Sequence, residues 1–205
     1  IVFEEGVGPV PVSIRAEGGR PVFSQLSVAR LPELGPEPPP REEIAAVLSL
    51  APGEIGNGRL APRGASCGVP FLFVPLPDRS ILARARLDLG LWERRFADSW
   101  APALYPFATD PELPGSDLRA RMFGPEMGIV EDPATGAAAA AFAGYLAAAD
   151  PRRDGTLRWV VEQGFEMGRP SLLHVEADRS NGAVTAVRVG GASVLVGEGT
   201  MEIPA

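Results

Sequence analysis

The stretch RMFGPEMGIVEDPATGAAAAAFAGYL, residues 121–146, decides how this chain folds. It runs into an alanine-rich segment at 137–149, and alanine has the highest intrinsic helix propensity. The segment is apolar on every side, which is typical of a helix inside a domain rather than on its surface. Asp150-Pro151 follows and predicts the end of the helix. We therefore expect a buried helix over 137–149.

The turn EDPATG, residues 131–136, lies directly ahead of this helix and is the part of the stretch that can carry chemistry. The first turn of a helix has free backbone N–H groups and a partial positive charge. Such an end can hold a carboxylate or stabilise developing negative charge. Gly136 and Ala137 carry little bulk, so a ligand can approach their amides. Asp132 is near enough in sequence to move a proton in the same place.

A structural interpretation of the same turn stands beside the chemical one. Asp132 can be the N-cap of the helix, with Pro133 at the first helical position, or Thr135 can be the cap. Spacing alone favours the cap, because caps are far more common than catalytic sites.

The composition of the 205-residue chain excludes several kinds of chemistry. All 19 basic residues are Arg, so there is no lysine for a Schiff base with pyridoxal phosphate or for a phosphate-binding P-loop. The single His174 excludes an HExxH zinc site, and the single Cys67 excludes an intrachain disulfide. We expect no metal. A net charge of −7 without a basic patch argues against nucleic acid as a partner, and no apolar run is long enough to span a membrane.

The rest of the chain predicts many short strands around one or two buried helices, an α+β fold with no visible internal repeat. Gly and Pro, 24 and 22 residues, account for the frequent turns. The expected elements are a hairpin over 1–27 turning at Glu17-Gly18-Gly19, a Pro-rich segment at 31–40 outside helix and sheet, a helix over 41–50, a buried strand near a sheet edge at 67–76, a helix over 88–100 with Leu91, Phe96 and Trp100 inward, strands at 104–107 and 119–130, and strands over 157–203 with a hairpin at Asn181-Gly182.

The 121–146 stretch resembles the signature of the PhzF-like isomerase family of phenazine biosynthesis, which shares its fold with diaminopimelate epimerase. That signature reads R-x-F-x-P-x-x-G-I-x-E-D-P-A-T-G-S-A. This chain matches it at Arg121, Phe123, Pro125, Gly128, Ile129 and Glu131 to Gly136. Three more segments are similar to the family in the same order along the chain: Phe3-Glu4 with Gly6 and Gly8-Pro9-Val10, Ser66 with Gly68-Val69-Pro70, and Gln163-Gly164 with Met167-Gly168-Arg169-Pro170-Ser171.

The resemblance implies two similar halves, each a strongly curved sheet around a central helix, with the active site in the cleft between them. It implies a cytoplasmic isomerase or epimerase that works without cofactor or metal and moves a proton on a small amino-acid-like or unsaturated carboxylate. By residue match, Asp132 is catalytic, and Thr135, Gly136 and Ala137 bind the substrate. A homodimer is implied as well.

The chain departs from the family pattern in two ways. Ala137 stands where the family has Ser, which removes a hydroxyl but keeps the backbone amide. The family's N-terminal half, with its acid–base Glu and a His, is not matched. Residues 1–27 resemble only the closing strands of that half, 28–40 form a linker, and 41–205 form the C-terminal domain, whose last strands can return to the other half.

These departures predict a truncated chain that is inactive as an isomerase by itself. The alternative is a non-catalytic relic, or a small-anion-binding module of the same fold. Among the remaining polar candidates, Cys67 is expected to be a buried small residue and His174 an ordinary residue on a strand face. Arg121 and Arg169 are expected to be structural, with the binding of a carboxylate as the alternative.

Overall fold

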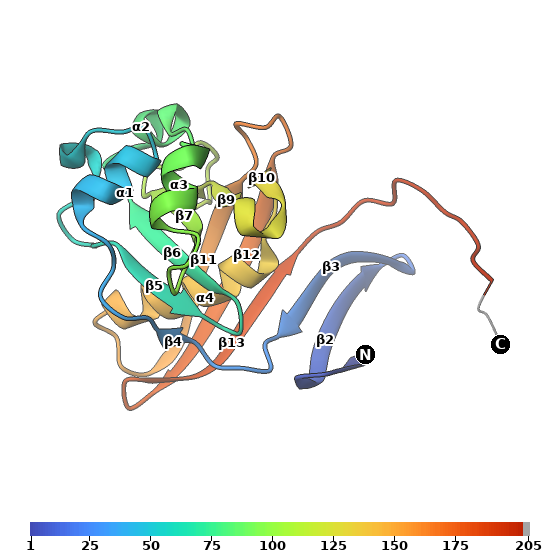
Figure 1. Ribbon diagram of the computed structural model, residues 1–205. Coiled ribbons are helices and arrows are strands. Elements are labelled where there is room, and N and C mark those ends of the chain that lie inside the picture. Colours follow the sequence, from blue (N-terminus) through green and yellow to red (C-terminus); the bar gives the residue numbers. More distant parts are fainter. Residues whose placement is uncertain (203–205) are drawn as a thin grey trace.

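The computed structural model describes residues 1–202, and one large mixed sheet dominates it (Figure 1). The strand order is β1-β2-β3-β13-β12-β11-β8-β7-β6-β5-β4, with β9 paired to β7 and β10 paired to β9. The strands are β1 (Val2–Glu5), β2 (Gly8–Glu17), β3 (Arg20–Ser27), β4 (Glu33–Leu34), β5 (Arg63–Ser66), β6 (Pro70–Pro75), β7 (Ala103–Ala108), β8 (Leu118–Ala120), β9 (Met122–Gly124), β10 (Ile129–Asp132), β11 (Gly155–Gln163), β12 (Ser171–Ser180) and β13 (Ala183–Gly191).

The helices are few, and one of them is central. They are α1 (Arg41–Val47), α2 (Arg79–Arg84), α3 (Leu89–Arg95) and α4 (Gly136–Ala149), with short 3-10 turns at Pro52–Glu54 and Pro125–Met127. Figure 1 shows α4 within the curve of the sheet, while α1, α2 and α3 lie together on the outside. The predicted α+β class, with a curved sheet around a buried helix, is confirmed.

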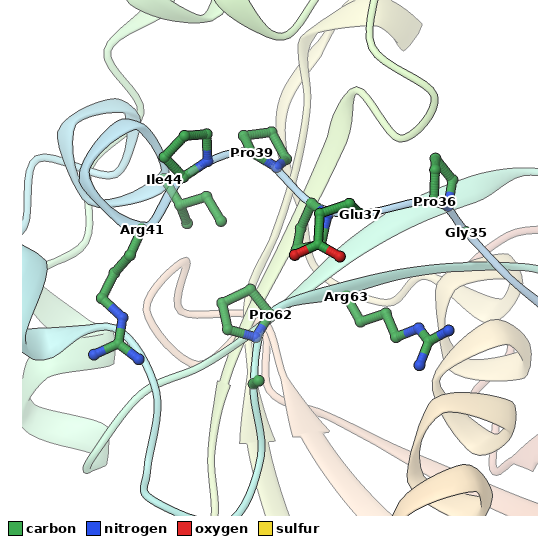
Figure 2. Close-up of a pocket in the computed structure, with 11 residues that line it drawn as sticks. Gly35, Pro36, Glu37, Pro39, Arg41, Ile44, Pro62 and Arg63 are labelled. Atoms are coloured by element: carbon green, nitrogen blue, oxygen red, sulfur yellow. The ribbon is translucent and has the colours of Figure 1, made fainter.

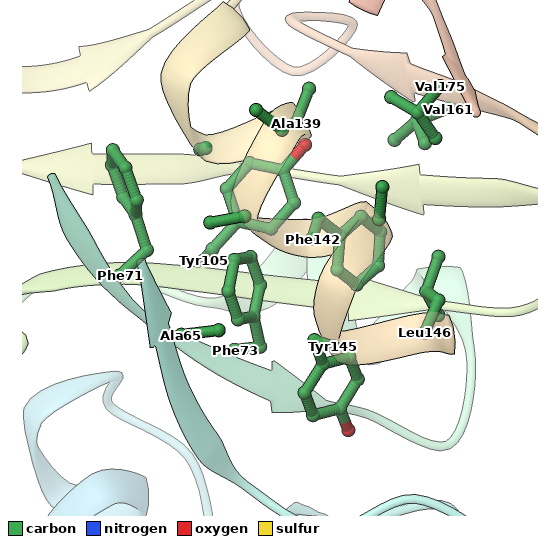
Figure 3. Packing of buried hydrophobic residues seen from close by; sticks show 14 of the residues in the cluster. Ala65, Phe71, Phe73, Tyr105, Ala139, Phe142, Tyr145, Leu146, Val161 and Val175 are labelled. Carbon is green, nitrogen blue, oxygen red and sulfur yellow. The ribbon is translucent and has the colours of Figure 1, made fainter. Parts of the chain in front are cut away.

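Helix α4 fills the space that the sheet encloses. Every residue from Ala138 to Ala147 is buried. Phe142 lies at the centre of an aromatic cluster, with its ring centroid 5.1 Å from that of Phe73, 5.3 Å from Tyr105 and 4.7 Å from Phe107 (Figure 3). Alanine side chains on the other sides of the helix are small enough to let strands approach from several directions.

A second core forms between the sheet and the outer helices. Strand β6 belongs to both cores: Phe71 and Phe73 join the cluster around α4, whereas Leu72 and Val74 join the cluster under α1 to α3. Successive side chains of a strand point to opposite faces of the sheet, so a strand buried on both faces reads as a continuous apolar run.

The prediction that this strand lies near a sheet edge agrees with the strand order, in which only β5 and the two-residue β4 lie between β6 and that end of the sheet. Strand β6 pairs with β5 on one side and with β7 on the other. Its two prolines, Pro70 and Pro75, are its first and last residues. Proline lacks the N–H that a ladder needs, and at strand ends this loss interrupts little pairing.

Several helices and strands begin or end at other residues than the sequence predicted. The helix expected over 88–100 ends at Arg95, with Trp92 and Phe96 buried and Trp100 38% exposed. The Pro-rich segment contains the two-residue strand β4, which pairs with β5. Helix α1 ends at Val47, before the expected end. The final strand ends at Gly191, and 192–202 have no regular structure; Ile203, the expected end, lies outside the described residues.

Both predicted hairpins are confirmed. Strands β2 and β3 are joined by Gly18 and Gly19, which have φ of 56° and 79°. Strands β12 and β13 are joined by Asn181 and Gly182, with φ of 52° and 84°. Two successive residues with positive φ are typical of the turn that fits the twist of a two-residue hairpin.

The segment between β3 and α1 lies against α4 at Pro32 and Gly144. A Cβ atom built on Gly144 would collide with the Cβ atom of Pro32 and would lie 2.6 Å from its Cγ atom. This helical glycine is therefore required by packing, although glycine is a poor helix former.

We predict that Gly144→Ala destabilises the protein by about 2 kcal/mol, because the cost of overpacking exceeds the gain in helix propensity. Urea unfolding measures the change. Gly90→Ala in α3 is the matched control: the nearest atom to its added Cβ is the mobile end of Arg94, at 3.3 Å, so stability should be unchanged or higher. A Gly144→Ala protein as stable as the wild type would contradict this packing.

Candidate functional site

Of the two caps proposed for the turn between β10 and α4, the structure has Thr135 at the N-cap, without a capping side-chain hydrogen bond. Strand β10 ends at Asp132, and Thr135 occupies the N-cap position of α4, so Asp132 is not the cap. The Thr135 side chain makes no capping hydrogen bond to the helix. Its hydroxyl instead donates to Oδ2 of Asp132 at 2.6 Å.

Two other helices of the same protein have conventional caps. The Asp78 carboxylate accepts from the amide of Ile81 at the start of α2, and the Asp88 carboxylate accepts from the amide of Leu91 at the start of α3, each at 2.9 Å. Helix α4 has no such bond and no acidic residue in its first turn. No capping side chain therefore occupies the N–H groups of its first turn, and no carboxylate in that turn offsets their partial positive charge.

Gln163 forms hydrogen bonds to both Asp132 and Thr135, near the two ends of this turn. The side-chain amide nitrogen of Gln163, at the end of β11, donates to the backbone carbonyl of Asp132 at 2.7 Å and to Oγ1 of Thr135 at 2.9 Å. Its Oε1 accepts from the hydroxyl of Tyr105 at 3.1 Å and from the amide of Thr135 at 3.4 Å. In the sequence, Gln163 stands out only as a matched motif position. No local signal reveals its partners, which lie 28 to 58 residues away.

A pocket of about 480 Å³ opens beside the start of α4. Gly136 and Ala137, which the family resemblance implies as substrate-binding residues, line it. Asp132 and Thr135 are not among its lining residues and are held together by their hydrogen bond. The lining residues come from four parts of the chain: Val7, Leu26, Val28, Arg30, Cys67, Gly68, Val69, Gly136, Ala137 and Ala140.

The pocket has apolar walls with a positive character. Arg30 is its one charged side chain among the described lining residues, and these include no carboxylate. Cys67, which is half-buried, lies in the turn between β5 and β6. Burial, together with the charge of Glu33, raises the pKa of the Cys67 thiol to about 12. The thiol is protonated near neutral pH, so it is not a general base there.

Among the other polar residues singled out in the sequence, Arg121 has a structural role. Arg121 is buried and forms a bidentate ion pair with Glu131, at 2.7 and 2.8 Å, and also donates to the backbone carbonyls of Leu82 and Ala85. Arg169 is exposed, beyond the end of β11. The ring of His174 packs edge-on against Phe23, with centroids 5.2 Å apart.

A second, larger hollow lies elsewhere. It has a volume of about 610 Å³ and lies along the Pro-rich segment, between Arg41 and Arg63, with Glu37 over it (Figure 2). None of the predicted site residues lines it. Within residues 1–202 there is no group of three or more His, Cys, Asp or Glu side chains that could hold a metal ion. The helices described here are also too short or too polar to cross a membrane.

Comparisons with known proteins agree with the resemblance seen in the sequence. Residues 1–199 match the family model described as phenazine biosynthesis-like protein. The chain is 38% identical to an uncharacterized isomerase of Mesorhizobium japonicum, over 98% of this chain and 68% of that protein. It is 41% identical to the trans-2,3-dihydro-3-hydroxyanthranilate isomerase of Pseudomonas chlororaphis over 91 residues, which are 42% of this chain and 31% of that enzyme.

The fold is also that of a solved protein. The crystal structure of a PhzF-family phenazine biosynthesis protein from Bacillus anthracis superposes with a TM-score of 0.80 at 19% identity, over 93% of this chain. The chain spans 64% of the length of that protein. This likeness confirms the predicted epimerase-like architecture.

We predict that Cys67 reacts with iodoacetamide at least 100-fold more slowly than glutathione at pH 8. A raised pKa leaves little thiolate at that pH, and only the thiolate is nucleophilic. The logarithm of the alkylation rate should rise steadily with pH to beyond pH 10. A plateau near pH 9, as for an ordinary thiol, would contradict the assignment of Cys67 as a protonated wall residue.

Proposed function

The chain belongs to the phenazine biosynthesis-like protein family, and we propose that it forms one wall of a cofactor-independent isomerase site. The site would move a proton on a small amino-acid-like or unsaturated carboxylate. The uncapped start of α4 would bind the carboxylate, and Asp132 would act as an acid–base group. The observation that carries this proposal is the diversion of the Thr135 hydroxyl from the helix to Asp132, beside a pocket lined by Gly136 and Ala137.

The binding role follows from the electrostatics of the helix end. Free N–H groups with no competing carboxylate form an anion site, and apolar walls strengthen an electrostatic contact by excluding water. Val28, Val69 and Ala140 supply such walls around the amides of Gly136 and Ala137. A ligand with a carboxylate and a small apolar body fits this combination.

The catalytic role needs a second group. An isomerase that removes a proton at one position must return it at another. The described pocket walls include no carboxylate, and the Cys67 thiol is protonated near neutral pH. We propose that the second acid–base group comes from the part of the family fold that this chain does not match, since the chain spans 64% of the solved PhzF-family protein. This chain by itself would then bind the carboxylate but not turn it over.

The names of the relatives give the first substrate to test. The Pseudomonas relative is named for trans-2,3-dihydro-3-hydroxyanthranilate, a cyclic unsaturated amino acid. Its 41% identity covers 42% of this chain, so the compound serves as a probe of the reaction class.

A second function, small-anion binding without catalysis, has its own supporting observation. Ala137 lacks the hydroxyl that the family pattern carries at this position, while the residue still lines the pocket. Binding of the probe without any proton movement, even when the unmatched part of the family fold is present, would favour this function.

We predict that this chain, combined with the part of the family fold that it does not match, incorporates deuterium from D2O into trans-2,3-dihydro-3-hydroxyanthranilate or its product, and that Asp132→Asn lowers this rate at least 100-fold. Loss of a positioned acid–base group has an effect of this order. Mass spectrometry of the small molecule measures the exchange. The matched control is Asp98→Asn, on an exposed residue outside the pocket, which should exchange at the wild-type rate. Undiminished exchange in Asp132→Asn would remove Asp132 from the mechanism.

A further inference from the structure

We propose that Gln163 is a positioning residue, which acts through Thr135 to hold the carboxylate of Asp132 in a fixed relation to the start of α4. This inference rests on the proposed acid–base role of Asp132. It adds a residue that touches neither the pocket nor the substrate, because Gln163 is fully buried at the end of β11.

All the hydrogen-bonding capacity of the Gln163 side chain is directed at this turn and at one tyrosine. Two bonds run from its amide nitrogen, to the carbonyl of Asp132 and to Oγ1 of Thr135, and two arrive at its oxygen, from Tyr105 and from the Thr135 amide. A side-chain amide has two donors and an oxygen that accepts twice, so its capacity is used in full.

The direction of each bond is determined by the chemistry of its ends. A carboxylate only accepts, so the single hydroxyl proton of Thr135 points to Asp132. Oγ1 of Thr135 must then accept, which assigns the NH2 group of Gln163 to that side and its oxygen to Tyr105. Burial, with the charge of Asp132, raises the pKa of the Tyr105 hydroxyl, so this group remains a donor. The chain of bonds therefore runs one way, from Tyr105 through Gln163 and Thr135 to Asp132.

The backbone at Gly164, next to Gln163, packs against the turn at 131–136 and keeps it close to the Gln163 side chain. Gly164 has φ of 79°, and a Cβ atom built on it would lie 2.7 Å from the carbonyl oxygen of Pro133 and would collide with the carbonyl oxygen of Arg169. Pro133 thus packs directly on the end of β11. Asp132 and Thr135 flank Pro133 closely in sequence, so this contact places both above the Gln163 side chain.

The arrangement engages one oxygen of Asp132 and leaves the other available. Oδ2 accepts from Thr135, whereas no hydrogen bond within the described part of the chain reaches Oδ1. A carboxylate held by one oxygen cannot rotate freely, so Oδ1 keeps a constant direction. Misplacing a reacting group by about 1 Å costs on the order of 100-fold in rate.

The kinetic test compares variants that cut this chain of bonds with variants that keep it. In the proton-exchange assay, we expect Gln163→Met and Thr135→Val each to lower kcat 10- to 100-fold with KM changed less than threefold. Thr135→Ser keeps the hydroxyl and should stay within threefold of the wild type. Gln25→Met, on the half-buried glutamine of β3, is the matched control and should be unchanged. Full activity in Gln163→Met, or equal damage from Thr135→Ser and Thr135→Val, would overturn the proposal.

A second measurement does not depend on turnover. Hydrogen exchange of the Thr135 amide should become at least tenfold faster in Gln163→Met, while residues 140–147 of α4 keep wild-type protection. Tyr105→Phe keeps the ring, removes one donor to Gln163 and should cause a smaller increase. Unchanged Thr135 exchange in both variants, or a uniform loss of protection, overturns the positioning role. A wild-type protein that moves no proton overturns the proposed function, and hydrogen exchange then decides separately whether Gln163 holds the turn.

Discussion

The burial of α4 is the constraint on which the rest of the structure depends. A helix can be enclosed by a curved sheet only if strands approach it closely from several sides, and alanine allows this because its side chain is a single methyl group. Phe142, Tyr145 and Leu146 are the larger exceptions, and the rings of the first two fill the wider space next to β6 and β7. Gly144 has no side chain at all, and this allows Pro32, in the segment that follows β3, to pack directly against the helix.

Enclosing the helix also determines where its polar ends can be satisfied. The buried part of α4 begins only at Ala138, so the amides of its first turn belong to the exposed residues Gly136 and Ala137, next to the turn at 131–136. Thr135 and Arg121 each stabilise a part of this turn. Thr135 provides the backbone geometry of an N-cap, while its hydroxyl is bound to Asp132. Arg121 fixes the entry to the turn by its bidentate ion pair with Glu131.

The sequence predicted the features that depend on nearby residues. The helix over 137–149, the two hairpins and the fold family all follow from composition, turn chemistry or contiguous motifs. The pairing of β6 with β5 and β7 could not be read from the sequence, because a local pattern does not encode which strands pair. Trp100 was expected inside, but α3 ends at Arg95 and the periodicity of a helix no longer applies. Within the site, the sequence identified Asp132 and Thr135 but not the role of Gln163, because strand pairing brings it to the turn from a distant part of the chain.

The unused cap at α4 has a physical cost that the surrounding structure offsets. Replacing a capping hydrogen bond by none costs about 1 kcal/mol in typical helices. Here the hydroxyl forms a charge-assisted bond to Asp132 instead, and such bonds are about twice as strong as neutral ones. The turn is therefore stable without a cap, and the amides of Gly136 and Ala137 remain free. A turn selected only for stability would resemble those of Asp78 and Asp88, whose carboxylates bond directly to helix amides. The difference between these helix starts is what an anion-binding wall requires.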